Sequence, residues 1–216
     1  PYALRRSALG LVRIILEKKI SVSFDELLSK SMSLLKSGSK IDTEALNEQI
    51  LAFLKQRLKQ IISQNKVDAD LIESVLSADC DDFLNALDRI TQLDKISKSK
   101  DFFECSKVME RTSNILKKAP ELPRVNPKLF KEGLEEKLWI IYSQTKGDLE
   151  ELIEKGNYKA ATRLYADAFS QPVHVFFDKV LINVDNLKIR NNRLALMSAI
   201  NGLYGEKVAD LSRIKF

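Results

Sequence analysis

The sequence predicts an all-α protein built as a multi-helix bundle. Its 216 residues include only 7 glycines and 5 prolines, too few for a turn-rich β protein. Apolar residues recur with a period near 3.6 along almost the whole chain, which is typical of helices that bury one face. Hydrophobic residues make up 44% of the chain and charged residues 30%, an ordinary balance for a globular protein with a sizeable core.

Polar and capping residues divide the first half of the chain into five predicted helices. Ser37-Gly38-Ser39 is a polar break between two of them. Asp42, Asp68 and the pair Asp81-Asp82 precede apolar stretches, where an aspartate accepts hydrogen bonds from the free N–H groups that open a helix. The helices expected from these signals span residues 2–20, 24–36, 43–64 and 71–78, and a fifth opens at Asp81-Asp82.

The second half contains the strongest breaks in the chain. Three prolines fall within residues 119–127, and proline lacks an N–H and disfavours helix just before itself, so this stretch is the predicted linker. Pro127 suits the first turn of a new helix, and Pro172 is expected to separate two helices. Gly156 is an expected helix end, and Asn157 is the expected cap of the next helix. The helices expected here span residues 101–118, 127–143, 148–155, 158–169, 173–184 and 187–204, with a final turn or two at 208–214.

Cysteine usage and hydropathy point to a reducing, aqueous compartment. Cys80 and Cys105 are too few for a disulfide framework or a zinc site, and each is expected to fill space on a helix face. No apolar run approaches the roughly 18 residues that span a bilayer, and no signal-peptide pattern is present. These observations favour the cytoplasm. Because Pro1 already lies in a helical pattern, we expect the chain to be part of a longer protein.

The charge of the chain is modest in total but unevenly distributed. The net charge is +5, from 35 Lys and Arg against 30 Asp and Glu. Residues 105–131 hold seven cations and two anions, residues 186–216 hold six and two, and residues 1–19 hold five and one. Such polarity suits a protein that turns one side toward a polyanion.

The predicted helix over residues 101–118 carries the main candidate site. Val108, Thr112, Ile115 and Ala119 recur at helical spacing and form a stripe that can be buried. A second stripe beside it is polar and consists of Lys107, Arg111, Asn114 and Lys118. Three cations and an amide on one face can hold phosphates and still offer one group that reads a base edge. The alternative is an ordinary solvated face, since Lys and Arg are common on helix exteriors.

A second candidate site lies near the C-terminus, at Arg190-Asn191-Asn192-Arg193. Arg and Asn side chains pair with bases, whereas Lys mainly contacts phosphate. For Asn192 and Arg193 the alternative is a buried link, in which Arg193 bonds an acidic partner such as Asp178 and orients two helices.

No catalytic residue, cofactor-binding residue or metal ligand is expected in the chain. His174 is the one histidine, so a nucleophilic triad or a metal hydrolase is hard to build. The carboxylate pairs Asp81-Asp82 and Glu135-Glu136 are neighbours in sequence, do not face each other on a helix, and are explained by helix-start or surface roles. The glycines form no phosphate-binding loop. Trp139 is expected in the core rather than as a stacking platform. A stand-alone enzyme is therefore disfavoured.

Several blocks, in this order, carry a resemblance to a known family. They are PYALRRSALG at residues 1–10, DLIESVL at 70–76, RTSNILKK at 111–118, VHVFFD at 173–178, NRLAL at 192–196 and VADLS at 208–212. Together they resemble the C-terminal part of the bacterial glycyl-tRNA synthetase beta subunit. Two features depart from the family pattern: Glu110 stands where a lysine is common, and residues 21–40 are unusually polar.

The resemblance implies a helical body in residues 1–100 and a helical anticodon-binding domain of the DALR type in residues 101–216, related to that of arginyl-tRNA synthetase. It implies that the parent enzyme is a glycine–tRNA ligase that uses ATP and Mg²⁺, with the aminoacylation site mainly on the alpha subunit. The implied partners are glycine tRNA and that alpha subunit, and no membrane is involved. Whether the two helical parts share one core is left open.

Under this reading the chain binds tRNA and does not catalyse. The residues expected along the anticodon arm are Lys107, Arg111, Asn114, Lys117 and Lys118, with Arg190, Asn192 and Arg193 as second candidates. The alternative is a helical scaffold that docks partner subunits and has no nucleic-acid binding of its own. Such a scaffold predicts an exposed apolar patch instead of a cationic surface.

Overall fold

A computed structural model describes residues 2–34 and 43–215 of the chain. Within these residues it contains only α-helices and short 3₁₀ helices, with no strand, which confirms the predicted all-α class. The predicted cap Asp42 lies outside the described residues. The α-helices are α1 (Tyr2–Glu17), α2 (Phe24–Leu34), α3 (Thr43–Ile62), α4 (Ala69–Leu76), α5 (Phe83–Ile96), α6 (Lys100–Leu116), α7 (Gly133–Glu154), α8 (Tyr158–Lys179) and α9 (Leu187–Gly205). The 3₁₀ helices are η1 (Ser63–Asn65), η2 (Pro127–Leu129) and η3 (Leu211–Arg213).

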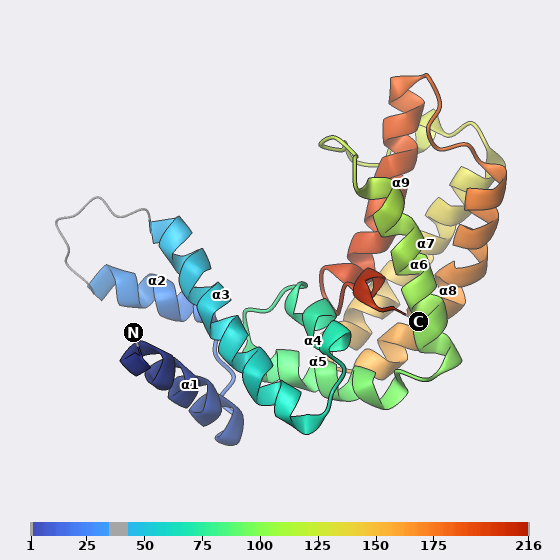
Figure 1. Ribbon diagram of the computed structural model, residues 1–216. Coiled ribbons are helices and arrows are strands. Elements are labelled where there is room, and N and C mark those ends of the chain that lie inside the picture. Colours follow the sequence, from blue (N-terminus) through green and yellow to red (C-terminus); the bar gives the residue numbers. More distant parts are fainter. Residues whose placement is uncertain (1, 35–42, 216) are drawn as a thin grey trace.

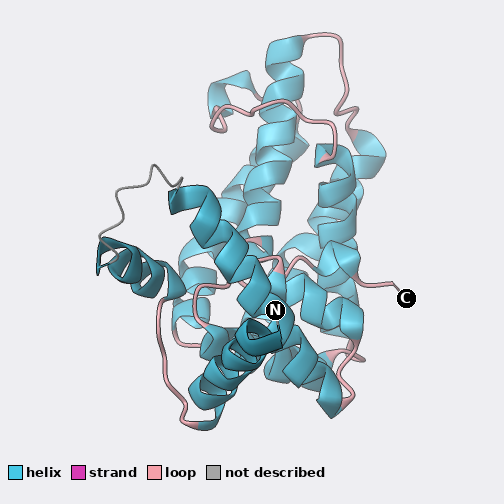
Figure 2. Ribbon diagram, turned by 60° about the vertical axis from the view of Figure 1, so that its left-hand side comes forward, coloured by secondary structure: helices cyan, strands magenta, loops and turns pink. Residues whose placement is uncertain are grey.

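The helices α6 to α9 stand side by side as an upright bundle on the right of Figure 1. In this bundle α6 packs against α8 and α9, and α7 packs against the same two helices. The helices α1, α2 and α3 extend to the left, while α4 and α5 lie between them and the bundle. The second view shows the same division, with α1 to α3 brought forward (Figure 2).

A continuous cluster of buried apolar residues runs from Ala8 in α1 to Leu211 in η3. The question that the sequence left open is thereby answered, since the helices before and after residue 100 share this core. Inside the bundle the rings of Tyr165 and Tyr204 lie 5.1 Å apart. The Tyr165 hydroxyl donates to the Ile200 carbonyl at 3.0 Å, and the Tyr204 hydroxyl lies 2.7 Å from the Thr162 hydroxyl. Complete burial raises the pKa of both phenols well above the usual value, and these satisfied hydroxyls tie α8 to α9.

The predicted helix caps within the described residues are confirmed. The Asp68 carboxylate accepts hydrogen bonds from the backbone N–H groups of Asp70 and Leu71 at the start of α4. The Asp82 carboxylate opens α5 in the same way. The Asn157 side chain accepts from the backbone N–H of Ala160 at 3.2 Å and caps α8. These caps satisfy N–H groups that have no partner within the helix.

Two predicted helix breaks are wrong, because packing outweighs local propensity. Helix α7 runs without interruption through residues 144–147, where Thr145 and then Leu149 are buried. Helix α8 contains Pro172, and the flanking Phe169 and Val173 are fully buried. Burial of these faces against the core compensates for the helix-breaking residues.

The region around Pro127 also differs from the prediction. Pro127 opens the short 3₁₀ helix η2 rather than an α-helix, and α7 begins six residues later at Gly133. The cap of α7 is a capping box in which Glu132 and Glu135 bond each other's backbone N–H groups. The predicted linker lies between the end of α6 and η2, as expected.

Gly156 offers a test of the backbone at the end of α7. Its φ is +67°, and an added Cβ would meet no atom closer than Asp88 Oδ2 at 3.8 Å. We expect Gly156→Ala to destabilise the fold by about 1–2 kcal/mol, because the left-handed conformation disfavours a side chain even where space is open. Urea unfolding followed by circular dichroism measures the change.

Gly147 is the matched control, since it lies inside α7 with no atom within 4 Å of an added Cβ. Gly147→Ala is expected to stabilise the fold by about 0.5–1 kcal/mol, because alanine loses less backbone entropy in a helix. Destabilisation by both variants, or by neither, would contradict the assigned end of α7.

Candidate nucleic-acid interface

The predicted polar row consists of Lys107, Arg111 and Asn114 on α6 and of Lys118, which lies just beyond the end of α6 at Leu116, and the row lies beside the predicted buried stripe. In that stripe Val108 and Thr112 are buried, and Ile115 and Ala119 are half-buried. The polar row itself divides into two parts with different surroundings. The half nearer the start of α6 faces carboxylates, and the half at its end does not.

Lys107 and Arg111 are the members that face carboxylates. The Lys107 ammonium lies 2.8 Å from Glu110 Oε2, one turn along the helix. Arg111 Nη1 lies 3.9 Å from Asp178 Oδ1, and Asp178 is also 3.2 Å from His174 Nε2. These pairs are half-exposed, so solvent weakens them, but they reduce the local positive field.

The end of α6 and the start of α9 form a groove of about 440 Å³. We call it the α6–α9 groove, and its lining residues are Asn114, Ile115, Lys117, Lys118, Ala119, Pro120, Asn183, Arg190 and Leu194. None of these residues is acidic. The structure therefore brings together four of the predicted site residues, from two segments about 70 positions apart: Asn114, Lys117, Lys118 and Arg190.

The polar groups of this groove are only partly engaged. The Lys117 ammonium donates to the Asn114 side-chain oxygen at 2.7 Å. Within the described residues, the side chains of Lys118 and Arg190 make no hydrogen bond or ion pair, although Arg190 is half-buried. A half-buried guanidinium next to exposed ammonium groups, with no carboxylate in the lining, is suited to bind an anion.

One contact joins α6 to α9, and a separate cap starts α9. The Asn201 side chain on α9 donates to the hydroxyls of Thr112 and Ser113 on α6, at 2.8 and 3.1 Å. At the other end of α9 the Asn186 side chain accepts from the backbone N–H groups of the first turn. Arg190 in the first turn of α9 and Asn183 before it line the groove, so the partial positive charge of the α9 N-terminus adds to the field there.

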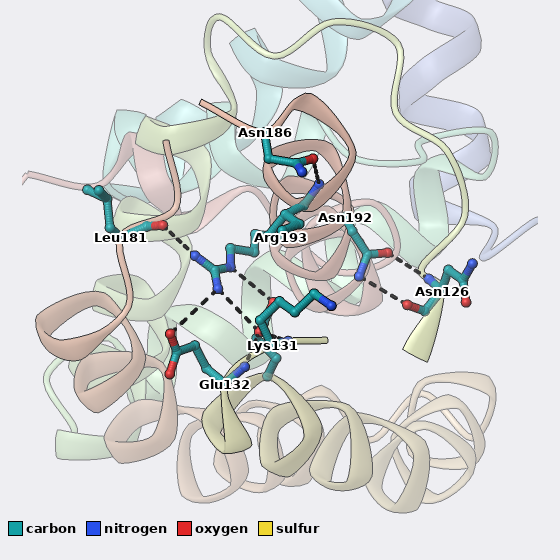
Figure 3. Close-up of polar contacts among 9 residues, drawn as sticks. Asn126, Lys131, Glu132, Leu181, Asn186, Asn192 and Arg193 are labelled. Carbon is teal, nitrogen blue, oxygen red and sulfur yellow. Dashed lines mark hydrogen bonds and ion pairs between the residues drawn. The ribbon is translucent and has the colours of Figure 1, made fainter. Parts of the chain in front are cut away.

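Asn192 and Arg193 do not face this groove. Arg193 is 4% exposed, its Nε lies 3.0 Å from Glu135 Oε1, and its Nη1 donates to the Leu181 carbonyl at 2.7 Å. Asn192 is 1% exposed and bonds both the backbone N–H and the carbonyl of Asn126, as Figure 3 shows. The expectation that they contact RNA does not fit this geometry, because their polar groups are buried and internally bonded. The geometry matches the alternative of a buried link, with Glu135 in place of Asp178 as the partner of Arg193.

Glu135, which the sequence suggested for a helix-start or surface role, does lie in the first turn of α7, but it is buried and paired with Arg193, and the sequence did not predict that pairing. Its side chain is fully buried and accepts from the backbone N–H groups of Lys131 and Glu132 at 2.7 and 2.6 Å. Burial raises its pKa, but the hydrogen bonds from Arg193 and from these two N–H groups outweigh burial, so the pKa of Glu135 is lowered overall. The sequence signal for Glu135 was its position as the third helical residue of a capping box. That position explains the contacts with N–H groups but not the pairing with an arginine 58 residues away.

The described residues offer no evident metal site. No group of three or more His, Cys, Asp or Glu side chains in residues 2–34 and 43–215 is arranged to hold a metal ion. In the same part of the chain, no helix is long and apolar enough to cross a bilayer.

The all-α bundle that holds the groove matches a known class of domain in sequence. Residues 106–204 match the sequence model of the DALR anticodon binding domain, and this range contains the whole α6–α9 groove. Residues 1–77 match the sequence model of the glycyl-tRNA synthetase beta subunit. The chain belongs to the glycyl-tRNA synthetase beta subunit family, which confirms the resemblance in its ordered sequence blocks.

Curated relatives agree with this assignment. The chain is 32% identical over 214 residues to a glycine–tRNA ligase beta subunit of Trichlorobacter lovleyi, an alignment that covers 99% of this chain and 31% of the relative. It is 29% identical over 225 residues to the corresponding protein of Desulfatibacillum aliphaticivorans, with the same two coverages. The match to the protein of Halothermothrix orenii is 32% over 205 residues, covering 94% of this chain and 29% of the relative. The chain thus spans about a third of the length of these relatives.

The Glu135–Arg193 pair yields a prediction about stability. We expect Glu135→Gln to destabilise the fold by about 3–5 kcal/mol at neutral pH, because it leaves the Arg193 charge buried without a partner. The folded pKa of Glu135 is lowered, so its ionisation stabilises the fold above the unfolded value of about 4.3. This stabilisation is lost as the pH falls through the lower folded value. The measurement is denaturant unfolding of both proteins between pH 7 and pH 3.

The difference between the two proteins is expected to be constant near neutral pH and to shrink below about pH 4. A double variant, Glu135→Gln with Arg193→Met, is the control and regains part of the lost stability, because it removes the unpaired charge. Equal stability of the wild type and Glu135→Gln at pH 7 would contradict the proposed link between α7 and α9.

Proposed function

We propose that this chain is the anticodon-arm-binding module of the glycyl-tRNA synthetase beta subunit. It would hold glycine tRNA while the ATP-dependent attachment of glycine occurs in another part of the enzyme, with the alpha subunit as its partner. The observation that carries the proposal is the α6–α9 groove, in which Lys117, Lys118 and Arg190 converge with no acidic residue in the lining. This groove lies inside the range that matches an anticodon-binding domain.

The groove combines two kinds of chemistry that an RNA loop requires. Lys117 and Lys118 provide ammonium groups, which attract phosphates as point charges. Arg190 provides a planar fork that can bond a phosphate or a base edge through two N–H groups. Anticodon loops are single-stranded and expose both phosphates and unstacked bases, so this combination suits them better than a closed duplex.

Lys107 and Arg111 are proposed to contact the RNA at the edge of the interface, outside the α6–α9 groove. Their pairs with Glu110 and Asp178 are half-exposed, and exposed pairs of this kind contribute at most about 1 kcal/mol each. An RNA phosphate can therefore replace the carboxylate at little cost. The central contacts are assigned to the α6–α9 groove, and Asn192 and Arg193 are assigned to support α9 from the inside.

Charge removal in the groove tests this proposal. Lys118→Ala and Arg190→Ala are each expected to weaken binding of a glycine tRNA anticodon stem-loop several-fold at low salt. Each is also expected to reduce the slope of log K against log salt by about 0.7–0.9, the loss of one phosphate contact. Titrations at four salt concentrations, followed by fluorescence anisotropy of labelled RNA, measure both quantities.

Lys159→Ala is the matched control, because Lys159 is an exposed lysine in the first turn of α8, outside the groove lining. It should leave the affinity and the slope unchanged. The proposal fails if the wild type shows no salt-dependent binding, or if the groove variants and Lys159→Ala lower the slope equally.

A specific observation also favours docking of a partner polypeptide by the N-terminal helices. Of the large apolar residues exposed among the described residues, seven lie in residues 2–34 and four elsewhere. On α1, Leu4 is 59% exposed and Ile14 is 55% exposed, next to the buried face of the helix. Concentrated exposed apolar surface of this kind marks an interaction site. We assign this surface to a partner subunit and the groove to tRNA.

The two functions are separable by mutation. Leu4→Glu with Ile14→Glu is expected to abolish binding of the alpha subunit, because two charges would be buried at the interface, while the affinity for the stem-loop stays unchanged. Size-exclusion chromatography with the purified alpha subunit measures the first effect, and the anisotropy titration measures the second. Unchanged co-elution with the alpha subunit would contradict docking of that subunit on α1.

A further inference from the structure

A second hollow lies across the linker from the α6–α9 groove. It measures about 450 Å³, and the residues that matter for its chemistry are Arg124, Trp139, Tyr142, Lys146 and Ser198. The linker residues Ala119 and Pro120 line the groove, whereas Leu122 to Val125 line this hollow, so one linker forms a wall of both. Helix α9 likewise contributes to both, through Arg190 on one side and Ser198 on the other. The two cavities are therefore neighbours.

The hollow presents an aromatic surface. Trp139 and Tyr142 lie one turn apart on α7, with ring centroids 5.2 Å apart and an angle of 17° between the ring planes. Both side chains are half-buried: they pack against the core and still line the cavity. The prediction that Trp139 belongs to the core is thus only partly right. Within the described residues, neither the Trp139 indole N–H nor the Tyr142 hydroxyl has a hydrogen-bond partner, so both are available to a ligand.

The rim of the hollow is positively charged. Arg124 and Lys146 are both exposed, and neither makes an ion pair with another described residue. As in the groove, no acidic residue lines the cavity. Aromatic rings flanked by unpaired cations are the combination by which proteins hold single-stranded RNA, with a base stacked on the ring and phosphates near the cations.

We propose that the Trp139–Tyr142 hollow binds one unstacked nucleobase of the same RNA loop whose phosphates occupy the α6–α9 groove. This inference rests on the proposed function and extends it with a base-stacking subsite. The base stacks on the free face of the aromatic pair, the Ser198 hydroxyl bonds its edge, and Arg124 and Lys146 contact the adjacent phosphates. The linker then lies between the stacked base and the phosphates in the groove.

Tryptophan fluorescence provides a direct test, because Trp139 is the one tryptophan of the chain. Addition of the anticodon stem-loop of glycine tRNA is expected to quench the tryptophan emission of the full chain, and the quenching is expected to reach a plateau as the binding site fills. An RNA duplex without a loop is expected to bind weakly through its phosphates and to leave the emission unchanged. Quenching by the duplex alone, or by a proline-rich peptide instead of the stem-loop, would overturn the inference.

Variants separate this subsite from the groove. Trp139→Leu is expected to weaken stem-loop binding by roughly 5- to 100-fold without changing the salt slope, because it removes stacking and no charge. Trp139→Phe retains a ring and should retain most of the affinity. Circular dichroism melting checks that each variant is folded. If Trp139→Leu does not fold, the fluorescence titration of the wild type decides whether the stacking subsite exists.

The outcomes distinguish the two proposals. If the stem-loop binds with a steep salt slope, but without quenching and with equal affinity for Trp139→Leu, the stacking subsite is wrong and the proposed function stands. If neither binding nor quenching occurs, the proposed function fails and the subsite fails with it.

Discussion

The buried ion pair between Arg193 and Glu135 is the interaction on which the rest of the site depends. It joins the N-terminal end of α7 to the N-terminal part of α9, and through Arg193 it also fixes the Leu181 carbonyl in the loop before α9. Both the α6–α9 groove and the Trp139–Tyr142 hollow have α9 as a wall. The ion pair fixes α9 against α7, and the Asn201 side chain joins α9 to α6, so that Arg190 on α9 lies near Lys117 and Lys118. Burial of a charge is tolerated here because backbone N–H groups and a guanidinium complete its hydrogen bonding.

Charge in this module is used in two distinct ways. Buried charges at Arg193 and Glu135 specify the packing of helices, whereas Lys117, Lys118 and Arg190 remain without a carboxylate partner at the surface. Lys107 and Arg111 fall between these extremes, since nearby carboxylates weaken their field without burying it. The cations of this row therefore differ in their surroundings: those near the end of α6 line a groove that has no carboxylate in its lining, whereas Lys107 and Arg111 lie near carboxylates.

Local signals in the sequence predicted local structure well. The all-α class and the caps at Asp68, Asp82 and Asn157 follow from periodicity and capping chemistry, and the structure confirms them. The sequence did not predict the continuous helix through Pro172, because burial of Phe169 and Val173 against distant residues outweighs the missing hydrogen bond. The site was predicted only in part for the same reason. Sequence spacing grouped three groove residues at the end of the predicted helix over residues 101–118. The approach of Arg190, and the pairing of Arg193 with Glu135, depend on contacts between segments far apart in the chain.

The central claim is that an RNA loop occupies the α6–α9 groove, and site-directed photocross-linking tests it most directly. The native thiols of Cys80 and Cys105 are buried, and burial raises the pKa of both, so a photoreactive label would attach selectively to an introduced surface cysteine. Labelled Lys118→Cys is expected to cross-link to nucleotides of the anticodon loop of glycine tRNA, while labelled Lys159→Cys gives no cross-link. Cross-links from position 118 that map to the acceptor stem, or equal yields from both positions, would contradict the account.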